Sequence, residues 1–351
     1  MMHYPPDYGM ERTLAMLRLF GQGSVAAPQD DRGAPHVTRG RHQKFDEDIV
    51  TTFFPGFQKQ RLTSNGIEIN LVHGGRDTPV LLLHGYPQTH VLWHKVAPKL
   101  AGKHTLVCPD MRGYGDSDKP HAAPEDHSVY CKRTMARDMV GVMDALGHQR
   151  WHVVGHDRGA RVAHRMALDH PDRILSFTSL DVVASQAAFE GMDSASAFAW
   201  FHWNLMRQPY PFPETLIGNS VRTYFDFLME RWCATPGALT PEAYAEYARC
   251  FCTPDGVRAT CAEYRAIELD LQHDEADRGR KITCPMLVLW GANTTKRPGW
   301  QTGRRLDMLA TWSERATDVR GRGLDCGHFL PEEKPDEVAA ELNEFFARTI
   351  G

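Results

Sequence analysis

The chain has 351 residues, of which 42% are hydrophobic and 24% charged, a composition typical of a globular protein with a sizeable core. Its formal net charge is −4 at pH 7, so its overall charge does not indicate a nucleic-acid partner. No apolar run approaches the roughly 20 residues that a membrane span needs, and the eight cysteines form no C-x-x-C pair. We therefore expect a cytoplasmic protein with free thiols and no membrane or nucleic-acid partner.

Residues 1–52 differ in composition from the rest of the chain. The stretch "GQGSVAAPQDDRGAPHVTRGRHQ" is rich in glycine, proline and charge and lacks apolar periodicity, which predicts a flexible extension. Three predicted strands follow it, "GIEINLVHGG", "PVLLLHG" and "HTLVCPD". The second is apolar throughout, as expected for a strand covered on both faces of its sheet.

Strands and helices then alternate. A predicted helix with one apolar face covers 135–146, and the strand "WHVVGHD" leads into a helix over 158–170 that Pro171 ends. After the strand "RILSFTSLD" the alternation stops, and residues 184–277 are aromatic and helical in pattern. It resumes with "CPMLVLWG" and a final helix. We expect an α/β core over 53–183 and 278–351, with a mostly parallel sheet between helices, and a helical cap over 184–277.

The stretch Gly155-His156-Asp157-Arg158-Gly159 carries the first chemical signal. A strand that ends in G-x-(nucleophile)-x-G and turns into a helix is the nucleophile elbow of the α/β-hydrolase fold. The glycines allow the sharp turn, and the central side chain points out at the edge of the sheet. Here that side chain is a carboxylate, so Asp157 is the expected nucleophile.

A histidine and an orienting acid are expected to follow the nucleophile in the chain. "DCGHFLPEE" places His328 after a predicted strand and before the last helix, where this fold carries its base. One usual place for the acid holds Asn293 and no carboxylate. The other follows the strand after the elbow and holds Asp181, which we favour; Asp325 is a weaker candidate.

An aspartate nucleophile indicates a particular chemistry. A carboxylate displaces a leaving group from saturated carbon and becomes an alkyl ester, which water then cleaves at the carbonyl with help from the histidine. Two backbone N–H groups should stabilise the resulting oxyanion, and we expect them at Arg158 and at Tyr86 in "HGYPQT". Epoxides and alkyl halides both suit this plan.

The predicted cap holds donors that could surround a departing halide. His202 and Trp203 are adjacent, and Tyr244 and Tyr247 lie in "EAYAEYARCF". Imidazole, indole and phenol groups all donate hydrogen bonds. Packing in an aromatic core would explain the same residues without any role in binding.

Two arginines follow the nucleophile. Arg158 and Arg161 are three residues apart in the first turns of the predicted helix, so both can face one pocket. Guanidinium groups bind carboxylates through paired hydrogen bonds. We therefore expect an anionic 2-halocarboxylate whose carbon–halogen bond points toward Asp157.

From about Phe54 to Phe346 the chain resembles the fluoroacetate and haloacetate dehalogenases of the α/β-hydrolase fold. The resemblance rests on "HGYPQT", "GHDRGARVAHRMALDHP", "LD" before the cap, "FHWNLMRQP", "CAEYRA" and "GHFLPEE", in this order and spacing. It implies hydrolysis of haloacetate to glycolate and halide through a covalent aspartyl ester, without cofactor or metal, by an enzyme that is often a homodimer.

The resemblance also implies roles for individual residues. It makes Asp157 the nucleophile, His328 the base and Asp181 its orienting acid, and it gives the substrate carboxylate to Arg158 and Arg161. It implies a halide pocket formed by His202, Trp203 and one cap tyrosine, which spacing makes Tyr247, with Tyr244 as the alternative.

An epoxide hydrolase with the same Asp157, Asp181 and His328 is the alternative prediction. It would need tyrosines to protonate the epoxide oxygen. A neutral epoxide gains nothing from two cations, and burying unpaired charges costs several kcal/mol. The pair Arg158 and Arg161 therefore argues for the haloacid.

Overall fold

The computed structural model describes residues 50, 52–293 and 307–349. The predicted extension over 1–52 lies almost entirely outside these residues, as do residues 294–306. The described residues all belong to one compact unit.

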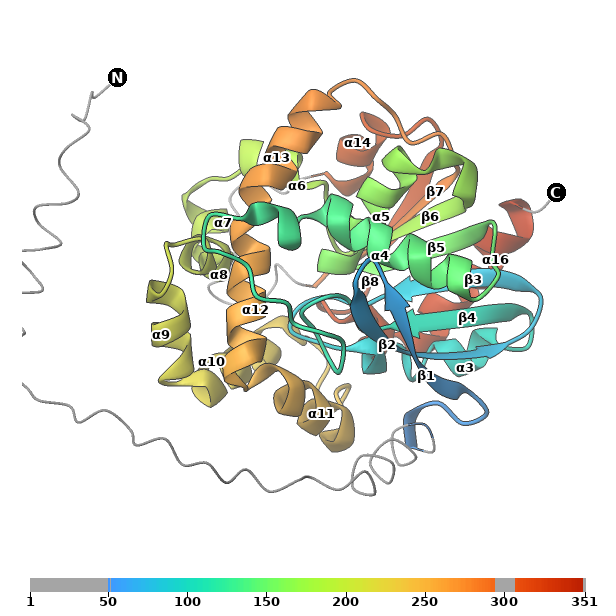
Figure 1. The fold of residues 1–351 in the computed structure, drawn as a ribbon. Coiled ribbons are helices and arrows are strands. Elements are labelled where there is room, and N and C mark those ends of the chain that lie inside the picture. Colours follow the sequence, from blue (N-terminus) through green and yellow to red (C-terminus); the bar gives the residue numbers. More distant parts are fainter. Residues whose placement is uncertain (1–49, 51, 294–306, 350–351) are drawn as a thin grey trace, which may run out of the picture. The chain divides into compact units, whose positions relative to one another are not determined.

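The described residues form one eight-stranded sheet (Figure 1). Its strands are β1 (Gln58–Ser64), β2 (Ile67–Gly75), β3 (Thr78–Leu83), β4 (His104–Pro109), β5 (Trp151–His156), β6 (Ile174–Leu180), β7 (Met286–Gly291) and β8 (Val319–Leu324). They follow the order β1-β2-β4-β3-β5-β6-β7-β8. The β1–β2 and β2–β4 pairs are antiparallel and all other pairs are parallel, so the carboxyl ends of β3 to β8 meet at one edge.

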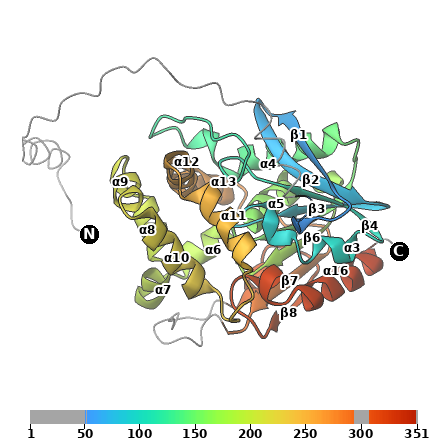
Figure 2. The same cartoon turned by 90° about the horizontal axis from the view of Figure 1, so that it is seen from below.

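Helices cover both faces of the sheet (Figure 2). One face carries α4 (Lys132–Ala145) and α5 (Arg158–Asp169), and the opposite face carries α3 (Ala97–Leu100) and α16 (Pro335–Thr349). The shorter elements are η1 (His90–Trp93), η2 (His127–Val129), η3 (Pro171–Arg173), α14 (Met308–Ser313) and α15 (Leu330–Glu333).

A run of helices separates β6 from β7. It comprises α6 (Ser185–Glu190), α7 (Ser194–Ala199), α8 (Phe201–Met206), α9 (Phe212–Gly218), α10 (Val221–Trp232), α11 (Pro241–Phe251), α12 (Pro254–Arg265) and α13 (Ile267–Ala276). Helices α7 to α12 gather to one side of the sheet in both ribbon views. These elements fall within the interval for which the sequence predicts a helical cap.

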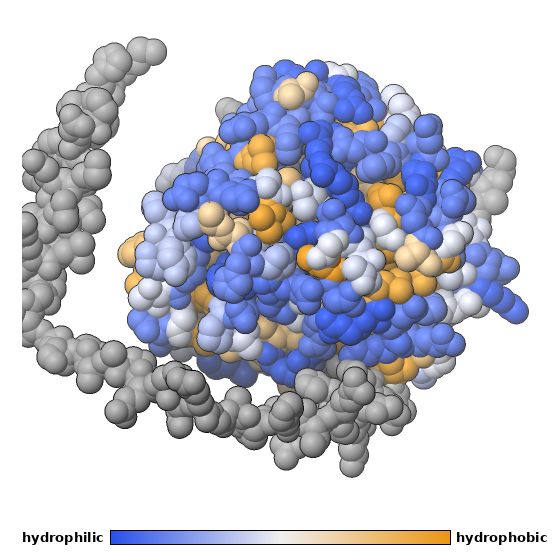
Figure 3. Space-filling view, in the orientation of Figure 1, coloured by the Kyte–Doolittle hydropathy of each residue, from blue (hydrophilic) through white to orange (hydrophobic). Residues whose placement is uncertain are grey.

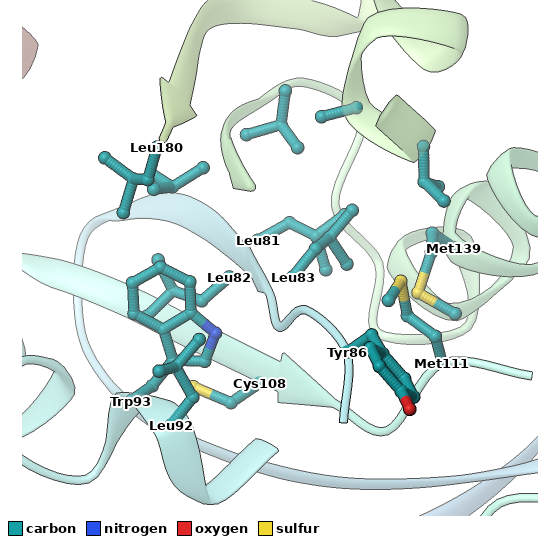
Figure 4. Packing of buried hydrophobic residues seen from close by; sticks show 14 of the residues in the cluster. Leu81, Leu82, Leu83, Tyr86, Leu92, Trp93, Cys108, Met111, Met139 and Leu180 are labelled. Carbon is teal, nitrogen blue, oxygen red and sulfur yellow. The ribbon is translucent and has the colours of Figure 1, made fainter. Parts of the chain in front are cut away.

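The central strand β3 shows why the sheet is stable. Leu81, Leu82 and Leu83 are fully buried, as the apolar run predicts. Because side chains alternate along a strand, Leu82 faces Trp93 while its neighbours face the side of Met139 (Figure 4). Because β3 is packed on both faces, its carboxyl end is held in a defined position, and the chain leaves this end toward the site.

The alternation of strands and helices expected from the sequence is confirmed, with one strand missed. β1 is an edge strand that pairs only with β2, and its sequence "QKQRLTS" is mostly polar because much of it is exposed. An exposed edge strand does not need the apolar pattern by which the other strands were predicted.

Hydrophilic residues dominate the visible surface (Figure 3), as expected for a chain with 24% charged residues. The face shown in Figure 3 is largely hydrophilic, with apolar residues scattered over it. Among the described helices, none combines the length and hydropathy needed to span a bilayer.

Candidate active site

The turn between β5 and α5 holds Asp157 in an unusual backbone conformation. Its φ is +47° and its ψ −114°, a region that non-glycine residues rarely adopt. The flanking glycines are required by close backbone contacts. A Cβ on Gly155 would lie 2.4 Å from the backbone of Ala160, and one on Gly159 would lie 2.4 Å from the carbonyl oxygen of His84. The sequence therefore forms the predicted sharp turn, and Asp157 stands at its apex.

The two carboxylate oxygens of Asp157 have different partners. Oδ1 accepts a hydrogen bond of 3.0 Å from the backbone N–H of Tyr86, whereas Oδ2 lies 3.9 Å from Nε2 of His328. Burial raises the pKa of Asp157, but the neighbouring His328, His156 and Arg158 and the Tyr86 N–H lower it to about 2. The carboxylate is therefore ionised at neutral pH, and Oδ2 is its free oxygen.

His328 is held by an acid at the end of β6. Its Nδ1 lies 2.6 Å from Oδ2 of Asp181, whose Oδ1 accepts a hydrogen bond of 2.8 Å from the backbone of Gly291. Burial lowers the pKa of His328, yet the hydrogen bond and charge of Asp181 and the charge of Asp157 raise it above its ordinary value. The other candidate acid, Asp325, instead accepts a hydrogen bond from Asn293.

The two arginines differ in how their charge is balanced. Arg158 is fully buried, and its Nε donates to both carboxylate oxygens of Glu263, at 2.8 and 2.9 Å. Lys132 contacts the same carboxylate. Together these cations hold the pKa of Glu263 below its usual range even though burial raises it. Arg158 thus has a fixed counter-ion on α12.

Arg161 has no acidic partner within salt-bridge distance in the described part of the chain. Its Nη1 donates to Ser185 Oγ at 3.0 Å, and its guanidinium lies 4.6 Å from the ring centre of Trp203. Burial and the charge of Arg158 lower the pKa of Arg161 to about 10. Nε of Arg161 and Nη1 of Arg158 are buried and have no hydrogen-bond partner within residues 52–293 and 307–349. Two guanidinium donors are therefore available to an anion.

The predicted halide donors are only partly brought together. His202 and Trp203 are buried on α8, with ring centres 6.5 Å apart. Tyr247 does not join them, since its hydroxyl donates to Glu332 at 2.5 Å. Tyr244, the alternative, donates to Asp226 at 2.6 Å. Neither tyrosine that the sequence suggested fits this position.

Tyr264 of α12, rather than Tyr247, lies beside His202 and Trp203. Its ring centre lies 5.8 Å from that of His202 and 6.3 Å from that of Trp203, and Arg158 lies 4.2 Å from it. "CAEYRA" lies within the family resemblance, but sequence reasoning gave Tyr264 no role. A buried Arg158 needs an acidic partner, and Glu263 is that partner. A search of the sequence for this acid would therefore have led to the neighbouring Tyr264.

Tyr224 and Trp232, which the sequence analysis did not single out, lie in the same region. The hydroxyls of Tyr86 and Tyr224 are 3.4 Å apart, and the ring of Trp232 lies 5.6 Å from that of His328.

The two residues predicted to donate to the oxyanion both lie next to Asp157. Tyr86 contacts Asp157 directly, and Arg158 is the first residue of α5, where backbone N–H groups have no partner within the helix.

One group of metal-ligand residue types occurs among the described residues, at Cys131, Asp270 and His273, whose ligand atoms lie within 4.8 Å of one another. The ammonium of Lys132 is 3.6 Å from Asp270 and already supplies a positive charge there. We therefore assign Asp270 to the ionic network of Lys132 and Glu263. The absence of metal and cofactor stays a prediction from the family resemblance.

Comparison with known proteins identifies relatives of this chain. The sequence pattern described as the alpha/beta hydrolase fold matches residues 78–335. A fluoroacetate dehalogenase of Burkholderia sp is 40% identical over 84% of this chain and 95% of its own. A soluble epoxide hydrolase of Corynebacterium sp. (strain C12) is 31% identical over 81% of this chain and 95% of its own. A crystal structure of a proposed alpha/beta hydrolase from Nostoc sp PCC 7120 is 48% identical, with a TM-score of 0.79 over 83% of this chain and 98% of that one.

Proposed function

The chain belongs to the haloacetate dehalogenase family of the alpha/beta-hydrolase fold, and on that premise we propose that it hydrolyses haloacetates, fluoroacetate or chloroacetate, to glycolate and halide. The observation that carries this proposal is the pair of unpartnered guanidinium donors beside an ionised carboxylate. Arg161 in particular is a buried cation without a carboxylate partner among the described residues. A buried cation favours an anionic ligand.

In the first step, Oδ2 of Asp157 attacks the carbon that carries the halogen. A carbon–oxygen bond forms, the carbon–halogen bond breaks, and its electron pair leaves with the halide. Arg158 and Arg161 hold the substrate carboxylate, while the Tyr86 N–H holds Oδ1 and leaves Oδ2 free. The product is a carboxymethyl ester on Asp157.

The departing halide needs donors and no proton. We assign this role to His202, Trp203 and Tyr264, with Tyr264 replacing Tyr247. Burial lowers the pKa of His202 to about 3 and raises that of Tyr264 well above its ordinary value, so both side chains are neutral at pH 7. Neutral buried donors can stabilise a halide ion without carrying a charge of their own.

In the second step, Nε2 of His328 takes a proton from water, and the water oxygen attacks Cγ of the ester. The negative charge develops on Oδ1, where the N–H groups of Tyr86 and Arg158 can stabilise it. Asp181 stabilises the imidazolium that forms. Collapse releases glycolate, whose new hydroxyl oxygen takes up the proton from His328, and leaves the water oxygen in the carboxyl group of Asp157. That group loses the remaining proton of the water to solvent and is again a carboxylate.

Epoxide hydrolysis is the second candidate, and a specific observation favours it. Burial raises the pKa of Tyr264 and of Tyr86, whose backbone contacts Asp157, so both phenols are protonated at neutral pH and could donate a proton to an epoxide oxygen. The Corynebacterium relative bears the name of this activity. Hydrolysis of a neutral epoxide gives Arg161 no role, whereas a haloacid supplies the carboxylate that this buried cation favours. We therefore prefer the haloacid.

The experiment that separates the two measures halide release from fluoroacetate and chloroacetate by the purified protein, with diol formation from styrene oxide in parallel. Halide with little or no diol supports the proposal. Diol without halide from either acid overturns it in favour of the epoxide. The Asp157→Asn variant is the control, and it should lose either activity by about a thousandfold or more while keeping the fold.

We further propose that the protein is a cytoplasmic homodimer. Its eight cysteines are all free thiols, which supports a reducing compartment. Large exposed apolar side chains on or next to α7, α9 and α10 could form the dimer contact, namely Phe198, Tyr210, Phe212, Leu216 and Phe227. Light scattering during size-exclusion chromatography tests the dimer, and a monomer at micromolar concentration would contradict it.

A further inference from the structure

Glu333 lies at the end of α15, five residues after His328, and is almost fully buried. Its carboxylate accepts four backbone hydrogen bonds. Two come from the residues on either side of His328, from Gly327 at 2.8 Å and from Phe329 at 3.0 Å. Two come from Ala234 and Thr235, each at 2.9 Å. No lysine, arginine or histidine in the described part of the chain forms a salt bridge with it.

These hydrogen bonds join two distant segments. Ala234 and Thr235 follow α10 in the helical run between β6 and β7, and the N–H of His328 donates to the carbonyl oxygen of Trp232 in the same segment, at 2.9 Å. A Cβ on Gly327 would lie 2.6 Å from the backbone of Ala234 and of Trp232, so only glycine permits this approach. The loop of His328 therefore packs directly against the end of α10.

The backbone N–H groups of Gly327, His328 and Phe329 and the carbonyl oxygen of His328 all have hydrogen-bond partners. Glu333 holds the N–H groups of Gly327 and Phe329, Trp232 holds that of His328, and Nε2 of His156 lies 2.7 Å from the carbonyl oxygen of His328. Of these partners, Glu333 alone contacts both sides of His328 and the α10 segment. Its removal would free two N–H groups of the loop and two of the α10 segment at once.

We propose that Glu333 is a positioning residue for the second half of the reaction: it locks the His328 loop to the end of α10 so that Nε2 can activate water against the ester. This inference rests on the proposed function. Attack by Asp157 does not need His328, so loss of the Glu333 contacts should spare the first step and slow the second. The ester on Asp157 should then accumulate.

The test uses Glu333→Gln, which keeps the size of the side chain and replaces one acceptor oxygen by an amide NH2 group. Glu332→Gln is the matched control, because Glu332 is the adjacent buried glutamate and faces Tyr247 and Lys95 instead. Halide release in the first turnover is followed by rapid quench with chloroacetate, the ester by mass spectrometry of the intact protein, and kcat in the steady state.

For Glu333→Gln we expect kcat to fall by about tenfold to a hundredfold, the effect of a misplaced catalytic group, with first-turnover halide release within about twofold of the parent. The carboxymethyl ester should be the main form of the variant during turnover. Glu332→Gln should keep the parent ratio of first-turnover rate to kcat. An equal fall in both steps without ester, or no change in either, overturns the role of Glu333.

A second variant and a pH profile separate positioning from general loss of structure. Glu333→Asp keeps the charge but cannot reach all four N–H groups, so it should also accumulate ester, and it serves if Glu333→Gln does not fold. The charge of Glu333 contributes to raising the pKa of His328, so the acid limb of kcat should move to lower pH in Glu333→Gln and stay in place in Glu333→Asp. An unmoved limb in both, with no ester, contradicts the inference.

The outcomes for the two proposals are distinct. If the parent protein releases no halide from any haloacetate, the proposed function fails, and the role of Glu333 in it fails as well. If the parent is active and Glu333→Gln does not accumulate ester, only the role of Glu333 fails.

Discussion

At the scale of the residue, the two carboxylate oxygens of Asp157 have different contacts and different proposed roles. Oδ1 is held by the Tyr86 N–H, whereas Oδ2 lies 3.9 Å from Nε2 of His328 and is the oxygen that we propose attacks the substrate. The strained backbone of Asp157 is compatible with this division because the turn exposes the carboxylate at the end of β5 while the glycines around it allow close packing.

Replacing His328 by alanine removes the base and leaves the nucleophile. The variant should release about one equivalent of halide per active site and then stop, because the ester is not hydrolysed. Mass spectrometry of the intact protein after incubation with chloroacetate should detect one added carboxymethyl group, which peptide mapping should locate at Asp157. Continued turnover at the parent rate would show that His328 is not the base.

Replacing Arg161 by alanine removes the buried cation that has no acidic partner among the residues that the structure describes. KM for chloroacetate should rise by about tenfold to a hundredfold, since hydrogen bonds to charged groups contribute about 1.5–3 kcal/mol. Arg161→Lys is the control: it keeps the charge but not the guanidinium geometry, and its KM should lie between those of the parent and the alanine variant. A KM that stays the same in both variants would contradict the proposed carboxylate clamp.

The pH dependence of kcat follows from the pKa shifts of the two reacting groups. Asp157, with a pKa of about 2, stays ionised over the accessible range. His328 must be neutral to accept a proton, and the hydrogen bond and charge of Asp181 raise its pKa against the effect of burial, while the charge of Asp157 is absent once the ester has formed. The rate should therefore fall as the pH drops through the pKa that His328 has in the ester form, measured with chloroacetate at saturation. A rate that stays constant down to pH 5 would contradict the role of His328 or a rate-limiting hydrolysis step.

At the scale of the element, α11 and α12 offer a direct comparison. Each carries a fully buried tyrosine, but Tyr247 of α11 donates to Glu332, whereas Tyr264 of α12 lies beside His202, Trp203 and Arg158. Helix α12 also carries Glu263, which holds Arg158 in place. One helix thus supplies both the proposed halide donor and the support for the carboxylate clamp.

The paired variants Tyr264→Phe and Tyr247→Phe test this comparison. Loss of the Tyr264 hydroxyl should slow first-turnover halide release by about tenfold or more, because one donor to a charged leaving group is lost. Loss of the Tyr247 hydroxyl should leave that rate unchanged and lower the free energy of unfolding by about 1–2 kcal/mol, because Glu332 loses its donor. The reverse pattern would restore the role that spacing gave to Tyr247.

The sequence predicts the parts of the site that stand at the ends of predicted strands or in the turn and helix that follow. Asp157, Arg158 and Arg161 follow from one turn and the helix after it, and Asp181 and His328 follow from the ends of predicted strands. Tyr264 could not be chosen over Tyr247 in this way, because both lie on buried faces of neighbouring helices. Which of them reaches His202 depends on how the helices pack, and that packing has no local signal in the sequence.

At the scale of the molecule, the predicted alternation of strands and helices matches the structure because the inner parallel strands, β3 to β7, are largely buried, whereas the edge strand β8 is only partly buried. The link between the sheet helices and the helical run was not predicted. Lys132 at the start of α4 and Arg158 at the start of α5 both contact Glu263 of α12. Likewise, Glu333 contacts the backbone after α10. Such buried contacts between distant segments are set by the three-dimensional arrangement, and the residues involved show no periodicity.

The measurement that tests the central claim most directly is the fate of the water oxygen in a single turnover. The protein, in excess over chloroacetate, reacts in water enriched in oxygen-18, and both glycolate and the peptide that contains Asp157 are analysed by mass spectrometry. The ester mechanism predicts unlabelled glycolate, whose new oxygen comes from Asp157, and one oxygen-18 in the Asp157 carboxylate. Labelled glycolate with unlabelled Asp157 would mean that water attacks the substrate directly, and would contradict Asp157 as the nucleophile.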